Sequence, residues 1–257
     1  MKNATITFKI FKAILLAGFV LAATSCHDLF FDCHEGNGQL GTQERSDVLF
    51  DFNSISLSAS FDVEIAQNSN ETSKSVIVEG DENLLEYIET RVQNSTLHLS
   101  LRDDDCIDQV TPMIVRIVNT EIVQIESMSS GSITVKDELY IKSGKELEIK
   151  SSGSGNITIE NLACSGTLIC KNSGSGNIKI QDTYARHAEI NISGSGDVIA
   201  GSTRINNCNI KSSGSGNTYL KIEDYLETNI TGSGDVYYQT QSNPTVKNNG
   251  SKPAIKE

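Results

Sequence analysis

Hydrophobic and polar residues alternate through most of the C-terminal half of this chain. Five segments of this kind each run up to a glycine-serine motif, and the alternation resumes directly after the motif. A period of two places the apolar side chains on one face of a β-strand, whereas an amphipathic helix needs a spacing near 3.6. The pattern therefore predicts a β-strand on each side of every motif.

The motif is Ser-Gly-Ser-Gly followed by Asn or Asp, with Thr in place of the first Ser in the last copy. Self-similarity at a fixed period is typical of a solenoid, in which each repeat forms one coil. A period near 20 residues is too short for a strand and a long helix. We therefore predict an all-β fold, a parallel β-helix with coils of about 20 residues. The first glycines of the five copies, spaced by 21, 20, 20 and 18 residues, are Gly153, Gly174, Gly194, Gly214 and Gly232.

Aligning the five copies produces four mostly apolar columns, two before the motif and two after it. In a β-helix each column would stack along the axis inside the coils. Two of the cysteines that occupy these columns, Cys170 and Cys208, lie two coils apart, roughly 9–10 Å, which is too far for a disulfide. We expect both to be buried free thiols. The columns are Leu147, Leu168, Ala188, Cys208 and Leu226; Ile149, Cys170, Ile190, Ile210 and Thr228; Ile157, Ile178, Val198, Thr218 and Val236; and Ile159, Ile180, Ala200, Leu220 and Tyr238.

The motif itself predicts a tight corner in every coil. We expect its glycines to adopt positive φ, which glycine enters without steric cost. The Asn or Asp that follows can form a ladder along the axis, each side chain bonding its equivalent one coil away, at about 4.8 Å. The corner residues are Gly153, Gly155 and Asn156; Gly174, Gly176 and Asn177; Gly194, Gly196 and Asp197; Gly214, Gly216 and Asn217; and Gly232, Gly234 and Asp235.

The N-terminal half is less regular, but it also favours strands, and we take residues 47–240 as one β-helical head domain. One interruption, 81–90, predicts a helix capped by Asp81, with Leu84, Leu85 and Ile88 on one face. Residues 26–46 and 241–257 lack apolar periodicity, so we predict a tether and a loose tail. The predicted strands are 61–65, 76–78, 97–101 and 113–117.

Residues 1–25 have the features of a signal peptide. Three lysines precede an apolar run of eleven residues, 13–23, which is too short for a membrane span of about 20 residues. Small residues then lead to Cys26, as in a bacterial lipobox, although Ala23 stands where Leu is usual. We expect Cys26 to carry a lipid that anchors the chain in a membrane; the alternative is cleavage near Ser25 that leaves a plain thiol.

Charge and cysteine content narrow the classes of partner. The net charge is −12, and removal of residues 1–25 takes away three lysines and makes it −15. A body this acidic repels nucleic acid, so we predict no nucleic-acid partner. Lipidation of Cys26 would leave five cysteines, an odd number, and an exported protein can form disulfides. Cys33 and Cys106, which both flank the repeat, are one candidate pair, although nothing in the sequence fixes that pairing.

The segment Val78-Glu79-Gly80-Asp81-Glu82-Asn83-Leu84, the strand at 97–99 and the Ser-Gly-Ser-Gly corners together resemble a known family. This is the auto-transporter adhesin head domain family, also called the GIN domain, which is common in envelope proteins of Bacteroidetes. The resemblance covers about residues 47–240. It implies a β-helical fold and an envelope location, and it brings no catalytic or ligand-binding residues to this sequence. Together with the predicted signal peptide and lipid, it leads us to expect an exported protein at the outer membrane or cell surface.

No motif in the sequence indicates catalysis. The serines between corner glycines lack the Gly-x-Ser-x-Gly context of a hydrolase, and the repeat strands carry no clustered carboxylates for glycoside hydrolysis. Three of the five corner positions are Asn, which argues against calcium, so we predict no metal and no cofactor. Our leading hypothesis is a non-enzymatic, lipid-anchored protein that adheres to or binds a surface glycan or protein. The alternatives are a periplasm-facing module of envelope maintenance or sensing, and a polysaccharide-active enzyme.

Overall fold

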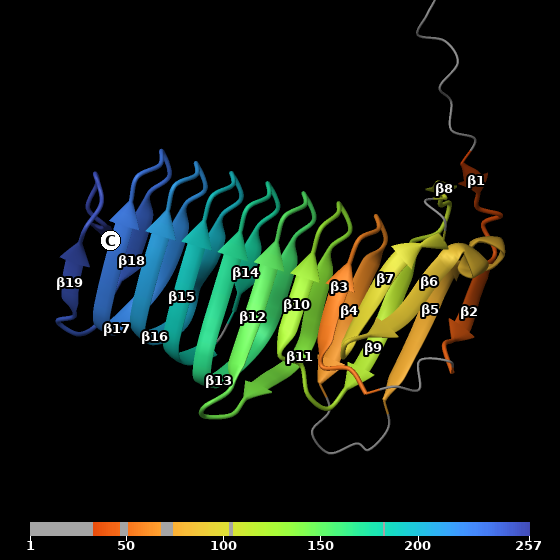
Figure 1. Cartoon of the computed structure of the whole chain (residues 1–257), viewed down its shortest axis with the longest axis horizontal. Coiled ribbons are helices and arrows are strands. Elements are labelled where there is room, and N and C mark those ends of the chain that lie inside the picture. The colour runs from red at the N-terminus through yellow and green to blue at the C-terminus, as the bar shows by residue number, and fades with distance from the viewer. Residues whose placement is uncertain (1–32, 47–50, 68–73, 103–104, 182) are drawn as a thin grey trace, which may run out of the picture.

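The computed structural model describes residues 33–46, 51–67, 74–102, 105–181 and 183–257. It is a parallel β-helix of about six turns with about 21 residues per turn, which confirms the predicted fold class. The coils stack along the long axis, from an N-terminal cap to the C-terminal strands (Figure 1). No helix among the described residues has the length and hydrophobicity that a membrane crossing requires. The predicted signal peptide and Cys26 lie outside the described residues.

The N-terminal part combines parallel coils with antiparallel strands. Strand β5 pairs antiparallel with both β2 and β9, and β6 and β7 form a hairpin. The bounds are β1 (His34–Glu35), β2 (Leu40–Glu44), β3 (Ser54–Leu57), β4 (Asp62–Gln67), β5 (Ser75–Asp81), the 3-10 helix η1 (Glu82–Tyr87), β6 (Ile88–Gln93), β7 (Thr96–Leu101), β8 (Ile107–Asp108) and β9 (Ile114–Asn119).

The repeat part is built from parallel strands, and the longest of them, such as β13, extend over most of one coil. The bounds are β10 (Gln124–Ser127), β11 (Ile133–Ile141), β12 (Glu146–Ser151), β13 (Ile157–Asn172), β14 (Ile178–Ile180), β15 (Thr183–Ile192), β16 (Val198–Ser212), β17 (Thr218–Ile230), β18 (Val236–Gln239), β19 (Thr245–Asn248) and β20 (Ile255–Lys256).

All four predicted columns stack in register inside the coils. Leu147 pairs with Leu168, and the same column continues through Ala188 and Cys208 to Leu226. The column members are buried, apart from Tyr238, which is partly buried. Stacking like on like lets a 20-residue repeat fill a narrow core, because each coil repeats the shape of the previous one.

The corners form the predicted ladder, with backbone donors. The Asn177 backbone N–H donates to the Asn156 side-chain oxygen at 2.9 Å, and each following corner residue repeats this arrangement. The bonds from Asp197 to Asn177, from Asn217 to Asp197 and from Asp235 to Asn217 measure 2.8, 2.7 and 2.9 Å. Asn and Asp are interchangeable here because both supply the acceptor oxygen that the ladder needs.

The expected positive φ at the corner glycines is wrong. Among the described glycines, only Gly38, Gly80 and Gly144 have positive φ. The corner glycines are needed because the coils are close: a Cβ on Gly174 would lie 2.1 Å from the carbonyl oxygen of Gly153 in the preceding coil. Glycine therefore serves close backbone approach and not an unusual turn conformation.

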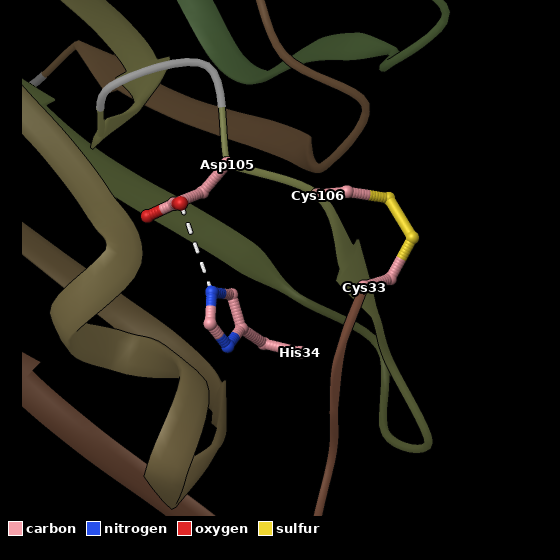
Figure 2. The surroundings of a disulfide bond; sticks show 4 residues. All are labelled: Cys33, His34, Asp105 and Cys106. Carbon is pink, nitrogen blue, oxygen red and sulfur yellow. Dashed lines mark ion pairs between the residues drawn. A yellow bond between two sulfur atoms is a disulfide. The ribbon is translucent and has the colours of Figure 1, made fainter. Parts of the chain in front are cut away.

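The described part of the expected tether, residues 33–46, forms part of the N-terminal cap. Strand β2 pairs antiparallel with β5, and β1 pairs parallel with β8. A disulfide joins Cys33 to Cys106, which confirms that pairing, and Figure 2 shows it beside the ion pair of His34 with Asp105 (Nε2 to Oδ1, 3.6 Å). Backbone pairing therefore orders a segment that carries no apolar alternation.

Asp81 occupies the N-cap position of a helix, as expected, but its side chain makes no capping hydrogen bond. The predicted helix at 81–90 is the shorter 3-10 helix η1, and Ile88 already begins β6. The fully buried Asp81 carboxylate instead accepts backbone N–H bonds from Gly38 (2.8 Å), Val110 (2.8 Å) and Thr111 (3.0 Å). Burial raises the pKa of Asp81, but these donors outweigh it and hold the pKa below its usual value. The carboxylate thus joins the end of β5 to two loops of the cap.

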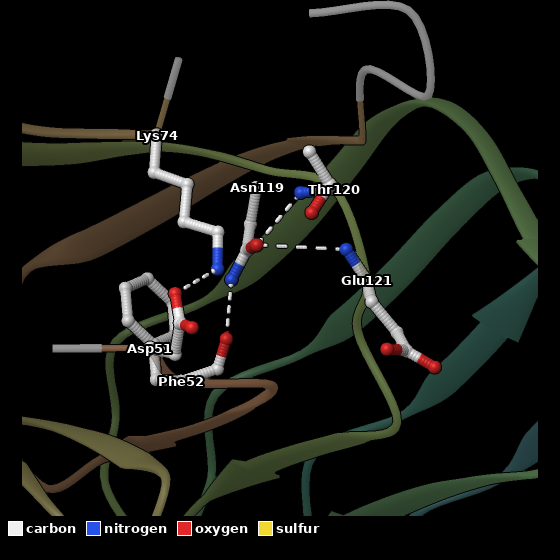
Figure 3. Close-up of polar contacts among 6 residues, drawn as sticks. All are labelled: Asp51, Phe52, Lys74, Asn119, Thr120 and Glu121. Carbon is white, nitrogen blue, oxygen red and sulfur yellow. Dashed lines mark hydrogen bonds and ion pairs between the residues drawn. The ribbon is translucent and has the colours of Figure 1, made fainter. Parts of the chain in front are cut away.

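Asn119, at the end of β9, fixes the entrance to the first coil. Its buried side chain donates to the Phe52 carbonyl at 2.7 Å and accepts from the Thr120 backbone N–H at 2.6 Å (Figure 3). Beside it, Lys74 bonds Asp51 across 2.7 Å. One amide thereby satisfies backbone groups on two segments far apart in sequence.

The expected loose tail, 241–257, forms a final coil. Strand β19 pairs with β17, and β20 pairs with β18. Lys252 donates to Asp235 at 2.6 Å and to the Ser233 carbonyl at 2.8 Å, so it closes the ladder at the last corner. This coil covers the edges of the preceding strands and acts as a capping repeat.

The other described cysteines are free and buried: Cys164, Cys170 and Cys208. The expectation for Cys170 and Cys208 is therefore confirmed. Burial raises the pKa of Cys170 to about 12, so its thiol stays protonated and unreactive at neutral pH.

Candidate binding groove

A groove of about 470 Å³ runs across the strands that precede the corners. It lies where β12, β13, β15, β16 and β17 leave the sheet and turn into the corners, so its length follows the solenoid axis. The groove exists because the chain bends there: the last outward residues of each strand form one wall, and the first residues of each corner form the other.

Two rows of side chains border the groove, and both arise from the repeat. Outward positions in adjacent coils are paired in register, for instance Lys150 with Lys171 and Asn191 with Lys211. Corresponding side chains therefore recur about every 4.8 Å along the groove. The strand row is Glu126, Lys150, Lys171, Asn191, Lys211 and Asn229, and the corner row is Ser152, Ser173, Ser193, Ser213 and Thr231.

Electrostatics differ between the two halves of the groove. In the N-terminal half, Glu148 bonds Lys150 at 2.9 Å and Lys171 at 2.7 Å. Partial burial raises the pKa of Glu148, but the two ammonium groups outweigh it and leave the pKa lowered. The same contact raises the pKa of Lys171. These two lysines therefore share one carboxylate partner within the protein.

The C-terminal half presents polar groups that the protein does not use. Within the described part of the chain, the side chains of Asn191, Lys211 and Asn229 have no hydrogen-bond or ion-pair partner, and neither do the hydroxyls of Ser193 and Ser213. Polar side chains exposed in this way bind water or a ligand. This half is therefore the better candidate for contact with a ligand.

A smaller hollow of about 320 Å³ adjoins the strand row on its other side and contains two carboxylates, Glu189 and Glu227. Glu227 accepts hydrogen bonds from Lys247 (2.8 Å), Tyr225 (2.9 Å) and Asn249 (2.6 Å), which lower its pKa to about 2. A glycosidase acid needs a raised pKa, so this arrangement suits a structural ion pair and not acid catalysis.

The family described as "Putative auto-transporter adhesin, head GIN domain" matches residues 51–242. This chain belongs to that family. The expected resemblance is thereby confirmed, and the family is described as an adhesin and not as an enzyme.

Solved structures share the GIN domain fold. A putative adhesin from Bacteroides fragilis has a TM-score of 0.76 and 22% identity, covering 86% of this chain and 98% of its own. A putative lipid binding protein from Parabacteroides distasonis has a TM-score of 0.66 and 24% identity, covering 87% of this chain and 98% of its own. A putative adhesin from Parabacteroides merdae has a TM-score of 0.64 and 22% identity, covering 87% of this chain and 98% of its own. No curated protein matches.

The corner residues predicted from the sequence all lie on one edge of the GIN domain, beside the groove. They hold successive coils together through the ladder and the close packing of their glycines. Among the described residues, no three His, Cys, Asp or Glu side chains are grouped as a metal site would need. The groove itself was missed, because the outward Lys, Asn and Ser residues are visible in the repeat but the bend that hollows the surface is not.

Proposed function

We propose that this chain is a non-enzymatic head domain that binds or adheres at the cell surface. The observation that carries the proposal is the groove, whose C-terminal half presents hydroxyl, amide and ammonium groups without partners in the described protein. Membership of an adhesin family indicates a surface or exported protein, and it supports adhesion more than catalysis. The repetition of the same groups over several coils suits weak contacts that add up along an extended ligand.

A polysaccharide-active enzyme is the weaker candidate. Its best pair of carboxylates is Glu189 with Glu227, and the lowered pKa of Glu227 keeps that group ionised at any pH where a general acid would act. The groove itself is lined by a single carboxylate, Glu126, among the described residues. Two carboxyl groups facing one another across a ligand are the minimum for this chemistry.

The proposal includes a lipid on Cys26 that holds the head at the outer membrane. Growth of producing cells with a tagged fatty acid tests it: the wild-type chain should incorporate the label, and Cys26→Ser should not. Equal labelling of both chains, or of neither, would contradict the anchor.

Surface exposure is tested by labelling intact cells with a membrane-impermeant amine reagent. Lys179, Lys211 and Lys256 are exposed on the folded coils and would react if the head faces outward. We expect labelling in intact cells equal to that in lysed cells. Labelling only after lysis would place the head in the periplasm and favour a role in envelope maintenance or sensing over adhesion.

A further inference from the structure

The ligand of the groove has to be extended, because the groove is long and open and crosses several coils. Its lining residues come from every coil between Glu126 and Thr231. A compact molecule would touch one or two coils and leave the remaining groups unused. A linear polymer lying along the solenoid axis would meet the same pair of wall residues at each coil.

The floor of the groove cannot accept a peptide as an added strand. The backbone N–H groups there already donate to the preceding coil, as in Ser173 to Ser151 (2.8 Å), Ser193 to Asn172 (2.9 Å) and Ser213 to Ile192 (2.9 Å). Strand addition needs free backbone groups at a sheet edge, and here the strands lie side by side across the floor. Contacts must therefore come from side chains in the two rows.

The spacing of those side chains also argues against an extended peptide. Equivalent groups recur about every 4.8 Å, whereas side chains on one face of an extended peptide recur about every 6.6 Å. The coil spacing is close to the length of one pyranose residue in an extended glycan. A linear glycan can therefore place about one sugar residue at each coil.

The charge of the protein favours an uncharged glycan over an acidic one as the ligand. In the N-terminal half, Lys150 and Lys171 share the single Glu148 carboxylate. Lys211 is the strand-row lysine without an ion-pair partner among the described residues, and the whole chain carries −12. A polyanion would be repelled by the acidic body, and a polycation would meet the ammonium groups of the strand row. Serine hydroxyls and asparagine amides donate and accept equally well, which matches sugar hydroxyls. The alkyl stems of the lysines can cover the apolar faces of sugar rings.

We propose that the groove binds an uncharged, extended glycan along the solenoid axis, centred on Asn191, Lys211 and the hydroxyls of Ser193 and Ser213. This inference rests on the proposed binding function and assigns its ligand class. Each coil from Lys150 to Thr231 contributes one amide or ammonium group from the strand row and one hydroxyl from the corner row, so affinity grows with the number of sugar residues engaged.

Affinity electrophoresis of the full chain in mild detergent tests this proposal. Native gels would contain uncharged polysaccharides (dextran, mannan or xyloglucan) or anionic ones (alginate or polygalacturonate). Ser193→Arg fills the middle of the groove, and Thr158→Arg places the same side chain on an outward position of β13 that does not line the groove. Asn191→Ala removes one contact without adding bulk. Thermal melting of each variant verifies that it is folded.

We expect at least one uncharged polysaccharide to retard the wild-type chain. Ser193→Arg should weaken binding at least tenfold, Asn191→Ala about threefold to tenfold, and Thr158→Arg not measurably. Absence of retardation by every uncharged polysaccharide, stronger retardation by the anionic ones, or equal loss in Ser193→Arg and Thr158→Arg would overturn the proposal. Adherence and surface labelling of cells do not depend on this assay, so the glycan assignment can fail while the binding function stands.

Discussion

At the residue scale, the corners are held by two features that every coil repeats. One is the ladder in which an Asn or Asp oxygen accepts the backbone N–H of its counterpart in the next coil. The other is a glycine whose missing Cβ allows the backbones to touch. Both depend on the distance between coils, so a change at one corner acts on its neighbours.

Substitution of Gly174 by Ala should destabilise the solenoid by about 1–3 kcal/mol, because the added methyl overlaps the Gly153 carbonyl. Gly201→Ala is the matched control, since a Cβ there meets nothing within 4 Å. Urea unfolding would measure both variants. Equal destabilisation would show that the corner does not need close approach.

Asn177→Ala should lower the free energy of unfolding by about 1 kcal/mol, because the Asp197 backbone N–H loses its acceptor. The control is Asn209→Ala, which removes an exposed amide from a strand position that is not part of the ladder. Denaturant unfolding again gives the comparison. A cost at Asn209 as large as that at Asn177 would argue against the ladder as a source of stability.

Much of the corner could be predicted from the sequence, but not its physical cause. The recurrence of Gly174 and its equivalents marked the bend, and the Asn or Asp after it indicated the ladder. Positive φ was the wrong reason for glycine, because a sequence shows which residues repeat and not how closely successive coils approach. The groove was missed for the same reason. The sequence shows that Lys and Ser recur in each repeat, but it does not show that the backbone between the two rows is bent inward to form a groove.

At the element scale, both ends of the solenoid are closed by segments that have no apolar alternation. Strands β1 and β2 join the N-terminal cap, and β19 and β20 complete the last coil. The sequence predicted a tether and a tail because periodicity detects strands with a buried face, whereas these strands are mostly exposed and are held by backbone pairing. Capping strands are generally more polar than the repeats that they cover.

Reduction of the Cys33–Cys106 disulfide should lower the free energy of unfolding by about 2–4 kcal/mol, because the bond closes a long loop in the unfolded chain. Denaturant unfolding with and without reductant measures it. The double variant Cys33→Ala, Cys106→Ala should match the reduced protein and no longer respond to reductant. An unchanged stability would mean that the cap does not depend on the bond.

Acid should loosen the C-terminal coil. Hydrogen bonds from Lys247, Tyr225 and Asn249 lower the pKa of Glu227 from 4.5 to about 2, so its carboxylate stabilises the folded coil above about pH 4.5. This contribution should disappear as the pH falls from 4.5 towards 2. Hydrogen exchange in β19, corrected for intrinsic rates, would measure it, with Glu227→Gln as the pH-independent control. Equal pH dependence in both proteins would contradict the assignment.

At the scale of the whole molecule, the repeat turns one short pattern into a long surface. The columns fill the core, backbone pairing between strands sets the coil spacing, and the outward rows become a groove whose chemistry repeats along the axis. The architecture and the family could be predicted from the sequence. A binding surface could be expected, but its place on the strand-to-corner edge needed the folded coils.

The most direct test of binding through this groove is the adherence of intact cells that display the protein. Cells carrying the wild-type chain, Ser193→Arg or Thr158→Arg, at equal surface level, would be counted after washing from a substratum to which the wild type adheres and a deletion strain does not. We predict that Ser193→Arg reduces adherence to the level of the deletion strain, while Thr158→Arg adheres like the wild type. Full adherence of Ser193→Arg would show that the groove is not the adhesive surface.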